Sequence, residues 1–279
     1  MKVLSDIRSL QDTLKPLRKQ GKSIGFVPTM GALHAGHGSL IKKARETCDI
    51  VVSSVFVNPT QFNDPSDFER YPRTLEKDSA YLESIDCDVV FAPKKEEVYG
   101  FERTQALPDP GALVQVMEGK FREGHFEGVM DVVHRLFTIV QPDKAFFGQK
   151  DFQQLAIIRF MTKAMELGIE IIGCPIVREG HGLARSSRNE LLSPNERYQA
   201  AILHSTLQQL RTATQAGEEN ALEAAREALQ AAPFFALEYL EVVDGTTLQT
   251  PGADADYQVA CVAGYIGEVR LIDNMTLIP

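Results

Sequence analysis

Short apolar segments alternate with segments of helical repeat along the first two thirds of the chain. The apolar segments are rich in β-branched and aromatic residues, which favours strands buried on both faces. They cover residues 23–27, 50–57, 88–92, 144–147 and 169–177. Around them, apolar residues recur every third or fourth position, a spacing that predicts amphipathic helices. The helices are expected at residues 5–20, 37–48, 75–85, 130–141 and 151–167.

This alternation predicts a parallel sheet. Parallel strands need crossover connections, and helical stretches of about 10–15 residues between strands are typical of right-handed βαβ units. The expected fold class is therefore α/β, with helices packed on the sheet. Among the local signals, Ser5 is expected to cap the first helix and Gly21 to end it, whereas Pro28 is expected to end the first strand.

The pattern changes after residue 177. A polar loop at residues 178–190 precedes Ser193 and Glu196, which have the spacing of a capping box. Two helices rich in Ala, Leu, Glu and Gln follow, and Gly264 and Gly267 suit a hairpin turn near the end. The strands of this part are expected at residues 236–243, 257–263 and 268–272. We therefore predict two domains, residues 1–177 and a smaller α+β domain at residues 178–279.

Composition narrows the class of protein. With 44% hydrophobic residues, the chain can bury a core without disulfides or metals. Its four cysteines are far apart and form no C-x-x-C pair, which favours reduced thiols over a zinc or disulfide framework. The first residues carry charge where a signal peptide needs an apolar segment, and no apolar run is long enough to span a membrane. A cytoplasmic protein is expected.

Charge excludes some partners. The formal net charge is −9, and residues 176–279 contain no lysine. A nucleic-acid-binding protein needs a basic stripe, and this chain has none. A small phosphate ligand held by two or three cations remains compatible with this charge.

Two histidines follow the first predicted strand, in the segment Met30-Gly-Ala-Leu-His34-Ala-Gly-His37. They share one face if a helix begins near His34. Backbone N–H groups at a helix start favour an anion, and glycines permit close approach of a ligand. Ligands of open α/β sheets bind beyond the carboxyl ends of strands, where this segment falls. We favour this interpretation over two solvated histidines, and we disfavour a metal pair because helical metal-binding histidines are usually four residues apart.

Three more polar segments follow predicted strands. Asn58-Pro-Thr-Gln61 offers amides for hydroxyls and carboxylates, although it also fits an ordinary Asn-Pro turn. In Gly148-Gln-Lys150-Asp151, a lysine opposes the dipole of a helix start, which suggests an anion; Asp151 as a simple N-cap is the alternative. Arg185-Ser-Ser-Arg188 suits phosphate oxygens, although an ordinary polar linker would also contain serine and arginine. The basic stretch at residues 122–126 could add to a phosphate site, but we favour a solvated loop there.

Together these segments resemble a known family. PTMGALHAGH resembles the H-x-G-H signature of the nucleotidyltransferase superfamily that includes class I aminoacyl-tRNA synthetases, and ARSSRN resembles its K-M-S-K-S loop. With VNPTQF, YPRTLEKD, FGQKDFQQ and RLIDN, the chain resembles the pantoate–β-alanine ligase family over essentially its whole length. The resemblance implies a Rossmann-like parallel sheet with helices on both faces, a smaller C-terminal α+β lid domain, and a homodimer.

The resemblance also implies an activity. ATP, with Mg²⁺, and pantoate would give a pantoyl adenylate and pyrophosphate, and β-alanine would then displace AMP to give pantothenate. Neither a nucleic acid nor a membrane is expected as a partner. Three alternatives stay open: a nucleotidyltransferase that acts on a phosphate ester, a relative of the tRNA synthetases, and a non-catalytic nucleotide sensor.

The resemblance assigns roles to matching positions. His34, His37, Lys150 and Arg188 would be catalytic, Gln61 would bind pantoate and β-alanine, and Gln154 would bind pantoate. ATP would contact Met30, Gly31, Ala32, Leu33, His34, Ala35, Gly36, His37, Gly148, Gln149, Lys150, Asp151, Val177, Arg185, Ser186, Ser187 and Arg188.

This chain departs from the family pattern at several positions. Gln149 replaces a common Glu, Thr60 a common Met, and Arg185 a common Met or Leu. Lys77 precedes Asp78 where some members carry a second acidic residue, so the resemblance assigns no protein ligand to Mg²⁺.

Overall fold

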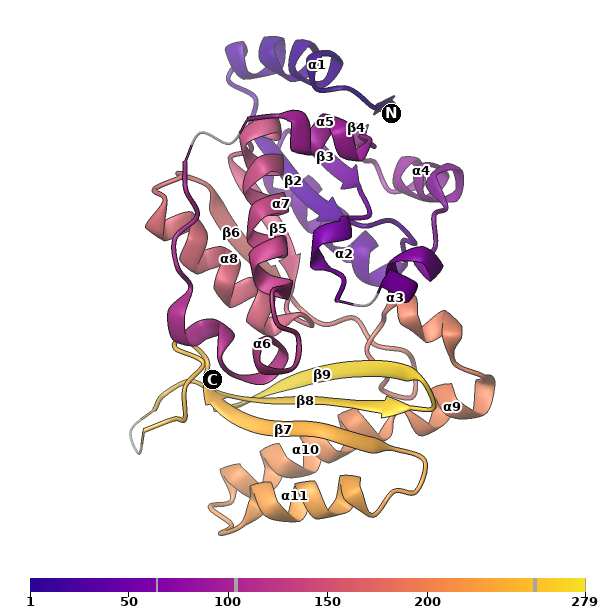
Figure 1. Ribbon diagram of the computed structural model, residues 1–279, viewed down its shortest axis with the longest axis vertical. Coiled ribbons are helices and arrows are strands. Elements are labelled where there is room, and N and C mark those ends of the chain that lie inside the picture. The colour runs from indigo at the N-terminus through magenta and orange to yellow at the C-terminus, as the bar shows by residue number, and fades with distance from the viewer. Residues whose placement is uncertain (64, 103–104, 253–254, 279) are drawn as a thin grey trace. The chain divides into compact units, whose positions relative to one another are not determined.

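The computed structural model describes residues 1–63, 65–102, 105–252 and 255–278, with only the backbone of residues 65–67. The chain forms two compact units (Figure 1). The first unit comprises residues 1–110, 122–149 and 157–175, and the second comprises residues 111–121, 150–156 and 176–279. Two short segments from the middle of the chain therefore group with its C-terminal part, and the domain boundary expected after residue 177 stays a prediction.

A parallel sheet forms the centre of the first unit. In the described part of the chain its strands are β1 (Lys2–Leu4), β2 (Ile24–Thr29), β3 (Ile50–Val55), β4 (Val89–Phe91), β5 (Lys144–Gly148) and β6 (Glu170–Cys174). They lie in the order β1-β4-β3-β2-β5-β6, and every neighbouring pair is parallel. The predicted parallel sheet is confirmed. Sequence analysis missed β1 because three residues are too short for a periodic pattern.

Helices flank this sheet (Figure 1). Their bounds are α1 (Ile7–Lys19), α2 (Ala35–Thr47), α3 (Pro65–Arg70), α4 (Leu75–Ser84), α5 (Lys95–Gly100), α7 (His125–Val140) and α8 (Phe152–Ala164). Side chains alternate along a strand, so neighbouring residues face opposite sides of the sheet. Val27 of β2 packs in the cluster that contains α2, whereas Phe26 meets Phe137 of α7 with ring centroids 6.3 Å apart. The two faces are thus covered by different helices.

Two local expectations are wrong. Asp6, rather than Ser5, caps α1, because its carboxylate accepts the N–H of Ser9 at 2.8 Å. Pro28 does not end β2, which continues to Thr29. Proline is tolerated there because β2 pairs with β5 only at its start, so this end of β2 pairs on one side alone.

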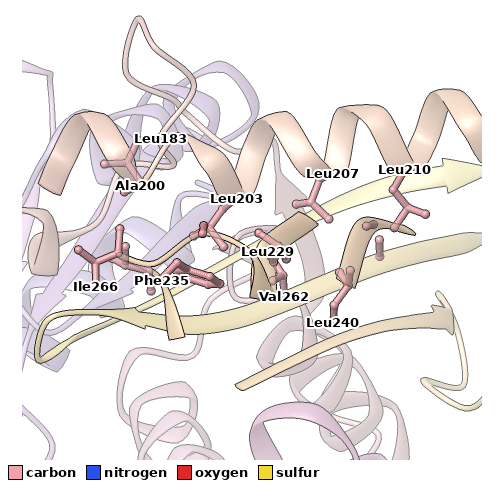
Figure 2. Close-up of a cluster of buried hydrophobic side chains, with 14 of the residues drawn as sticks. Leu183, Ala200, Leu203, Leu207, Leu210, Leu229, Phe235, Leu240, Val262 and Ile266 are labelled. Carbon is pink, nitrogen blue, oxygen red and sulfur yellow. The ribbon is translucent and has the colours of Figure 1, made fainter. Parts of the chain in front are cut away.

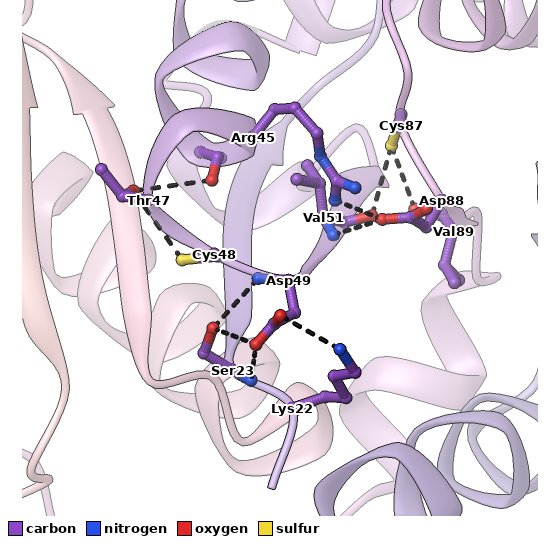
Figure 3. A network of polar contacts seen from close by, with 11 residues as sticks. Lys22, Ser23, Arg45, Thr47, Cys48, Asp49, Val51, Cys87, Asp88 and Val89 are labelled. Atoms are coloured by element: carbon purple, nitrogen blue, oxygen red, sulfur yellow. Dashed lines mark hydrogen bonds and ion pairs between the residues drawn. The ribbon is translucent and has the colours of Figure 1, made fainter. Parts of the chain in front are cut away.

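Carboxylates tie together the amino ends of the central strands (Figure 3). Asp49, before β3, accepts the N–H and the hydroxyl of Ser23, before β2, both at 2.9 Å. The backbone N–H of Ser23, its hydroxyl and Lys22 hold the pKa of Asp49 below its usual value. Asp88, before β4, accepts the N–H of Val51 at 2.7 Å and pairs with Arg45 of α2. Carboxylates therefore connect the starts of these strands, at the end of the sheet opposite to the predicted ligand site.

The second unit is built on a three-stranded antiparallel sheet. Its strands are β7 (Ala236–Asp244), β8 (Gln258–Ile266) and β9 (Val269–Ile278), and its helices are α6 (Met117–Phe121), α9 (Pro194–Gln199), α10 (Ile202–Gln215) and α11 (Ala221–Gln230). The predicted capping box is confirmed: Ser193 accepts the N–H of Glu196, and Glu196 accepts the N–H of Ser193. Gly267 forms the turn between β8 and β9 with φ +55°, whereas Gly264 lies within β8.

Leucines of α10 fill the core of this unit (Figure 2). Leu203, Leu207 and Leu210 recur at helical spacing and face Leu240 of β7 and Val262 of β8. In the described ranges, no helix is both long and apolar enough to cross a membrane.

We predict that Leu207→Ala lowers the free energy of unfolding by about 2–5 kcal/mol, because Leu207 is fully buried and its loss leaves a cavity. Urea unfolding followed by circular dichroism measures the effect. Leu191→Ala is the matched control, since Leu191 is 67% exposed and its truncation should change stability by less than about 0.5 kcal/mol. Equal losses for the two variants would contradict this packing.

Candidate functional site

The direction of the strand order reverses between β2 and β5. From β2 the chain adds β3 and then β4 on one side, and it later adds β5 and β6 on the other. Open α/β sheets bind ligands outside the carboxyl ends of the strands at such a switch point. Met30 directly follows β2, and Gly148 ends β5 while the N–H of Gln149 bonds to the carbonyl of Cys174 at 2.8 Å. The first and third predicted segments therefore both begin at this switch point.

A buried carboxylate shapes the loop between β2 and α2. Gly31 and Ala32 have φ values of +84° and +50°, a left-handed conformation that costs a non-glycine residue about 1–2 kcal/mol. Asp78 of α4 is only 2% exposed, and its two oxygens accept the N–H groups of Ala32 at 3.1 Å and Leu33 at 2.8 Å. The hydroxyl of Thr74 donates to the same carboxylate at 3.0 Å. Asp78 thus stabilises the turn that directly precedes His34.

The two histidines cap α2. His34 is the N-cap, and its Nδ1 accepts the N–H of Gly36 at 3.1 Å, while Nδ1 of His37 accepts the N–H of His34 at 3.3 Å. Their ring centroids lie 4.1 Å apart, so the expectation of a shared face is confirmed. A neutral imidazole whose Nδ1 accepts a hydrogen bond carries its proton on Nε2. Both rings therefore present an Nε2–H donor at a helix N-terminus.

Asn58 organises the second predicted segment. It is 1% exposed and caps the short 3₁₀ helix Pro59–Gln61. Its amide nitrogen donates to Oε1 of Gln61 at 3.1 Å and to the carbonyl of Gly128 at 3.2 Å. The amide nitrogen of Gln61 donates to the sulfur of Met30 at 3.0 Å. The first and second segments thus touch through the amide of Gln61.

The start of α7 supports this turn. Gly128 permits the approach, because a Cβ there would lie 2.3 Å from the carbonyl oxygen of Thr60. The hydroxyl of Tyr99 donates to Oδ1 of Asn58 at 2.6 Å, and Nδ1 of His125 lies 2.8 Å from the carbonyl oxygen of Gln61. His125 is 6% exposed, so the expectation of a solvated loop at residues 122–126 is wrong at this position.

The other predicted residues belong to the second unit. Lys150 and Asp151 precede α8, and the ammonium of Lys150 lies 3.7 Å from the Asp151 carboxylate. Gln154 lies in the first turn of α8 and is half-buried, whereas the neighbouring Gln153 is buried and donates to the carbonyls of Leu113 and Val116.

A short hairpin carries the arginine and serine segment. A β-bridge joins Arg178 to Ala184, and the N–H of Arg185 donates to the carbonyl of Val177 at 2.9 Å. Ser186 then caps the 3₁₀ helix Ser187–Leu191 by accepting the N–H of Arg188. The loop expected at residues 178–190 is therefore partly regular. The guanidinium of Arg185 lies 3.6 Å from a carboxylate oxygen of Glu179.

Sequence reasoning missed the residues that hold the site. They are Asp78, Tyr99 and Gly128. The sequence gives no local signal for the role of Asp78, because the N–H groups that it accepts lie more than 40 residues away.

Comparison with known proteins gives a consistent result. The family model described as pantoate-beta-alanine ligase matches residues 2–276. A pantothenate synthetase of Phocaeicola vulgatus is 52% identical over 99% of both chains, and one of Porphyromonas gingivalis is 50% identical over 99% of both. The crystal structure of pantothenate synthetase from Thermus thermophilus covers 100% of both chains with a TM-score of 0.92 and 43% identity. A Francisella tularensis ligase, complexed with βγ-ATP and β-alanine, covers 99% of this chain and 98% of its own with a TM-score of 0.80 and 35% identity.

We predict that Asp78→Asn loosens the loop before α2. The amide would place a donor against backbone donors, which should lower the free energy of unfolding by about 1–3 kcal/mol and speed hydrogen exchange at Ala32 and Leu33. Hydrogen-exchange mass spectrometry checks both residues. Glu76→Gln, an exposed acid on the same helix, should leave exchange unchanged. Unaltered protection in Asp78→Asn would show that the carboxylate does not hold the loop.

Proposed function

Because the chain belongs to the pantoate–β-alanine ligase family and condenses pantoate with β-alanine at the expense of ATP, we propose which residues perform each half of that reaction. The first half forms a pantoyl adenylate: a carboxylate oxygen of pantoate bonds to the α-phosphorus, and pyrophosphate leaves with the electron pair of the broken P–O bond. In the second half the amine of β-alanine bonds to the acyl carbon, AMP leaves, and the amine loses a proton.

The first half needs positioning and charge neutralisation rather than a base. The attacking carboxylate is already ionised near neutral pH. The reacting groups are anions, so the rate depends on aligning them and on stabilising the negative charge that grows on pyrophosphate. The roles of the residues below follow from this requirement.

His34 and His37 act as neutral donors to phosphate oxygens. Hydrogen bonds to Nδ1 of both rings support this role, since they leave the proton on Nε2. The backbone of residues 30–37 and the N-terminus of α2 add partial positive charge. The amide of Gln61, to which we assign the acid, contacts Met30 of this loop, and this contact is the single observation that carries the proposal.

Cations of the second unit neutralise the leaving group. Lys150 and Arg188 contact the phosphates, and Arg185, Ser186 and Ser187 complete the loop around the nucleotide. Gly148, Gln149, Asp151 and the backbone of Val177 contact ATP. The guanidinium of Arg188 and the hydroxyls of Ser186 and Ser187, at the start of one 3₁₀ helix, are groups that suit phosphate oxygens.

Amides bind the acid and the amine. Gln61 and Gln154 hydrogen-bond pantoate, and Gln61 also contacts β-alanine. Amide groups suit these substrates because hydroxyls and carboxylates offer both donors and acceptors.

ATP enters as its magnesium complex, with the metal as part of the substrate. Asp78 already receives three hydrogen bonds, and the described ranges contain no group of three His, Cys, Asp or Glu side chains arranged for a metal. The described residues thus do not fit a protein-built cage, and Mg²⁺ commonly keeps water and phosphate ligands instead. We assign no step to a protein-held metal.

The protein is further proposed to be a cytoplasmic homodimer. All four cysteines are buried free thiols, which suits a reducing compartment. The dimer rests on resemblance to the family.

The decisive experiment is pyrophosphate–ATP exchange with pantoate present and β-alanine absent. We predict exchange that requires pantoate, and we predict that His37→Ala and Lys150→Ala each lower it by about 10²–10³, as for loss of one preorganised transition-state donor. Lys77→Ala, an exposed lysine, is the control. Exchange that another acid supports instead of pantoate would overturn the substrate, and wild-type rates in both folded variants would overturn the residue roles.

We predict that Gln61→Ala weakens both acid and amine use while sparing the nucleotide. Loss of a hydrogen bond to a charged group should raise the KM for pantoate and for β-alanine about tenfold or more, with the Kd for ATP unchanged by calorimetry. Gln20→Ala, at an exposed helix end, should change none of these constants. A selective loss of ATP affinity in Gln61→Ala would mean that the subsites are assigned wrongly.

A further inference from the structure

Polar side chains of β9 hold together the three chain segments of the second unit. The segment RLIDN, residues 270–274, lies in this strand and has so far received no role. The unit comprises residues 111–121, residues 150–156 and the C-terminal part from residue 176. Arg270, Asp273 and Asn274 each contact a different one of them.

Arg270 binds the first segment. Its guanidinium donates to both carboxylate oxygens of Glu118 in α6 at 2.7 Å and also pairs with Glu238 of β7. The hydroxyl of Tyr239 donates to Glu118 at 2.8 Å. This buried network fixes α6 to the sheet.

Asp273 binds the base of the arginine hairpin. It is 3% exposed, and its carboxylate accepts both terminal nitrogens of Arg178 at 2.6 and 2.9 Å. The same carboxylate accepts the backbone N–H of Asn274 at 2.8 Å. The Arg178 guanidinium also donates to the carbonyl of Asn274 at 3.4 Å. Arg178 and Asp273 therefore fix the backbone of Asn274 on both sides.

Asn274 in turn binds the turn that carries Lys150. Its amide nitrogen donates to the carbonyl oxygen of Lys150 at 2.8 Å, and the residue is 7% exposed. Lys150 lies in a turn, where regular strand or helix hydrogen bonds do not set its backbone. Asn274 lies in a strand, whose backbone is held by its own hydrogen bonds. Its hydrogen bond therefore fixes the position of the Lys150 backbone.

We infer that Asn274 is a positioning residue for the ammonium of Lys150 in adenylate formation. Asn274 acts on the backbone of Lys150, which fixes where the side chain starts. The inference rests on the proposed contact of Lys150 with the phosphates. A misplacement of about 1 Å can cost on the order of 100-fold in rate, so one buried hydrogen bond is enough to matter.

A double-mutant cycle tests this inference. Lys150→Ala keeps the backbone carbonyl and hence the bond to Asn274, but removes the ammonium. Asn274→Ala should lower the kcat of pantoate-dependent pyrophosphate exchange roughly 10- to 100-fold in the wild-type background. In the Lys150→Ala background it should change that kcat less than about twofold, because coupled residues are not additive.

A second readout separates positioning from a general loss of structure. Transfer of the pantoyl group from supplied pantoyl adenylate to β-alanine does not involve departure of pyrophosphate. Asn274→Ala should leave this rate within about twofold of wild type, and its thermal unfolding should remain cooperative. Thr276→Ala, on the same strand, is the matched control for a substitution in β9. If Asn274→Ala does not fold, Asn274→Asp replaces it, since a carboxylate has similar size and cannot donate.

Three outcomes would overturn the inference. They are an exchange rate in the folded Asn274 variant equal to wild type, equal losses in both backgrounds, and an equal loss in both half-reactions. A wild-type exchange rate in Lys150→Ala alone would instead show that the proposed role of Lys150 is wrong. The cycle thus distinguishes failure of this inference from failure of the proposed function.

Discussion

The buried carboxylate of Asp78 is the interaction on which the histidine loop depends. It accepts two consecutive backbone N–H groups where the chain adopts a left-handed conformation at Gly31 and Ala32. Without that carboxylate, the N–H groups of two half-buried residues would lose their partner, and an unpaired polar group shielded from water is destabilising. The position of His34 as N-cap follows from the loop, and the direction of α2 follows from its cap. A residue of α4 thereby sets the direction of donors on α2.

The two edges of the parallel sheet have different chemistry. At the amino edge, Asp49, Asp88 and Asp143 accept the N–H groups of Ser23, Val51 and Ile24, which joins the strand starts to one another. At the carboxyl edge, the buried carboxylate of Asp78 accepts two N–H groups of the histidine loop, whereas glycines, amides and imidazoles directly follow the strands. Carboxylates repel phosphates, and the hydrogen bonds that Asp78 accepts turn its charge toward the backbone of the loop.

Sequence patterns predicted the elements better than the contacts between them. Periodicity indicated the parallel sheet, the strands near the end of the chain and a helix at residues 37–48, and all three are present, although the helix begins two residues earlier, at Ala35. Local chemistry sufficed for the Ser193 cap, whose partners are three residues apart. The pairing of Asp78 with Leu33 and of Asn274 with Lys150 links distant positions. Hydrophobic patterns show which face is buried, but not which polar group it meets there. The contacts of the site with substrates likewise stay proposals.

β9 is synthesised after all the segments that its polar side chains bind. It follows residues 111–121, 150–156 and 176–188 along the chain and binds one side chain or carbonyl in each. A ribosome releases about 5–20 residues per second, so these segments leave it seconds before their common partner does. Until β9 is in place, Glu118 and Arg178 lack their partners Arg270 and Asp273. Burial of either charge without its partner would be strongly destabilising. The contacts of α6, of the turn at Lys150 and of Arg178 with β9 can therefore form only after the last strand has been made.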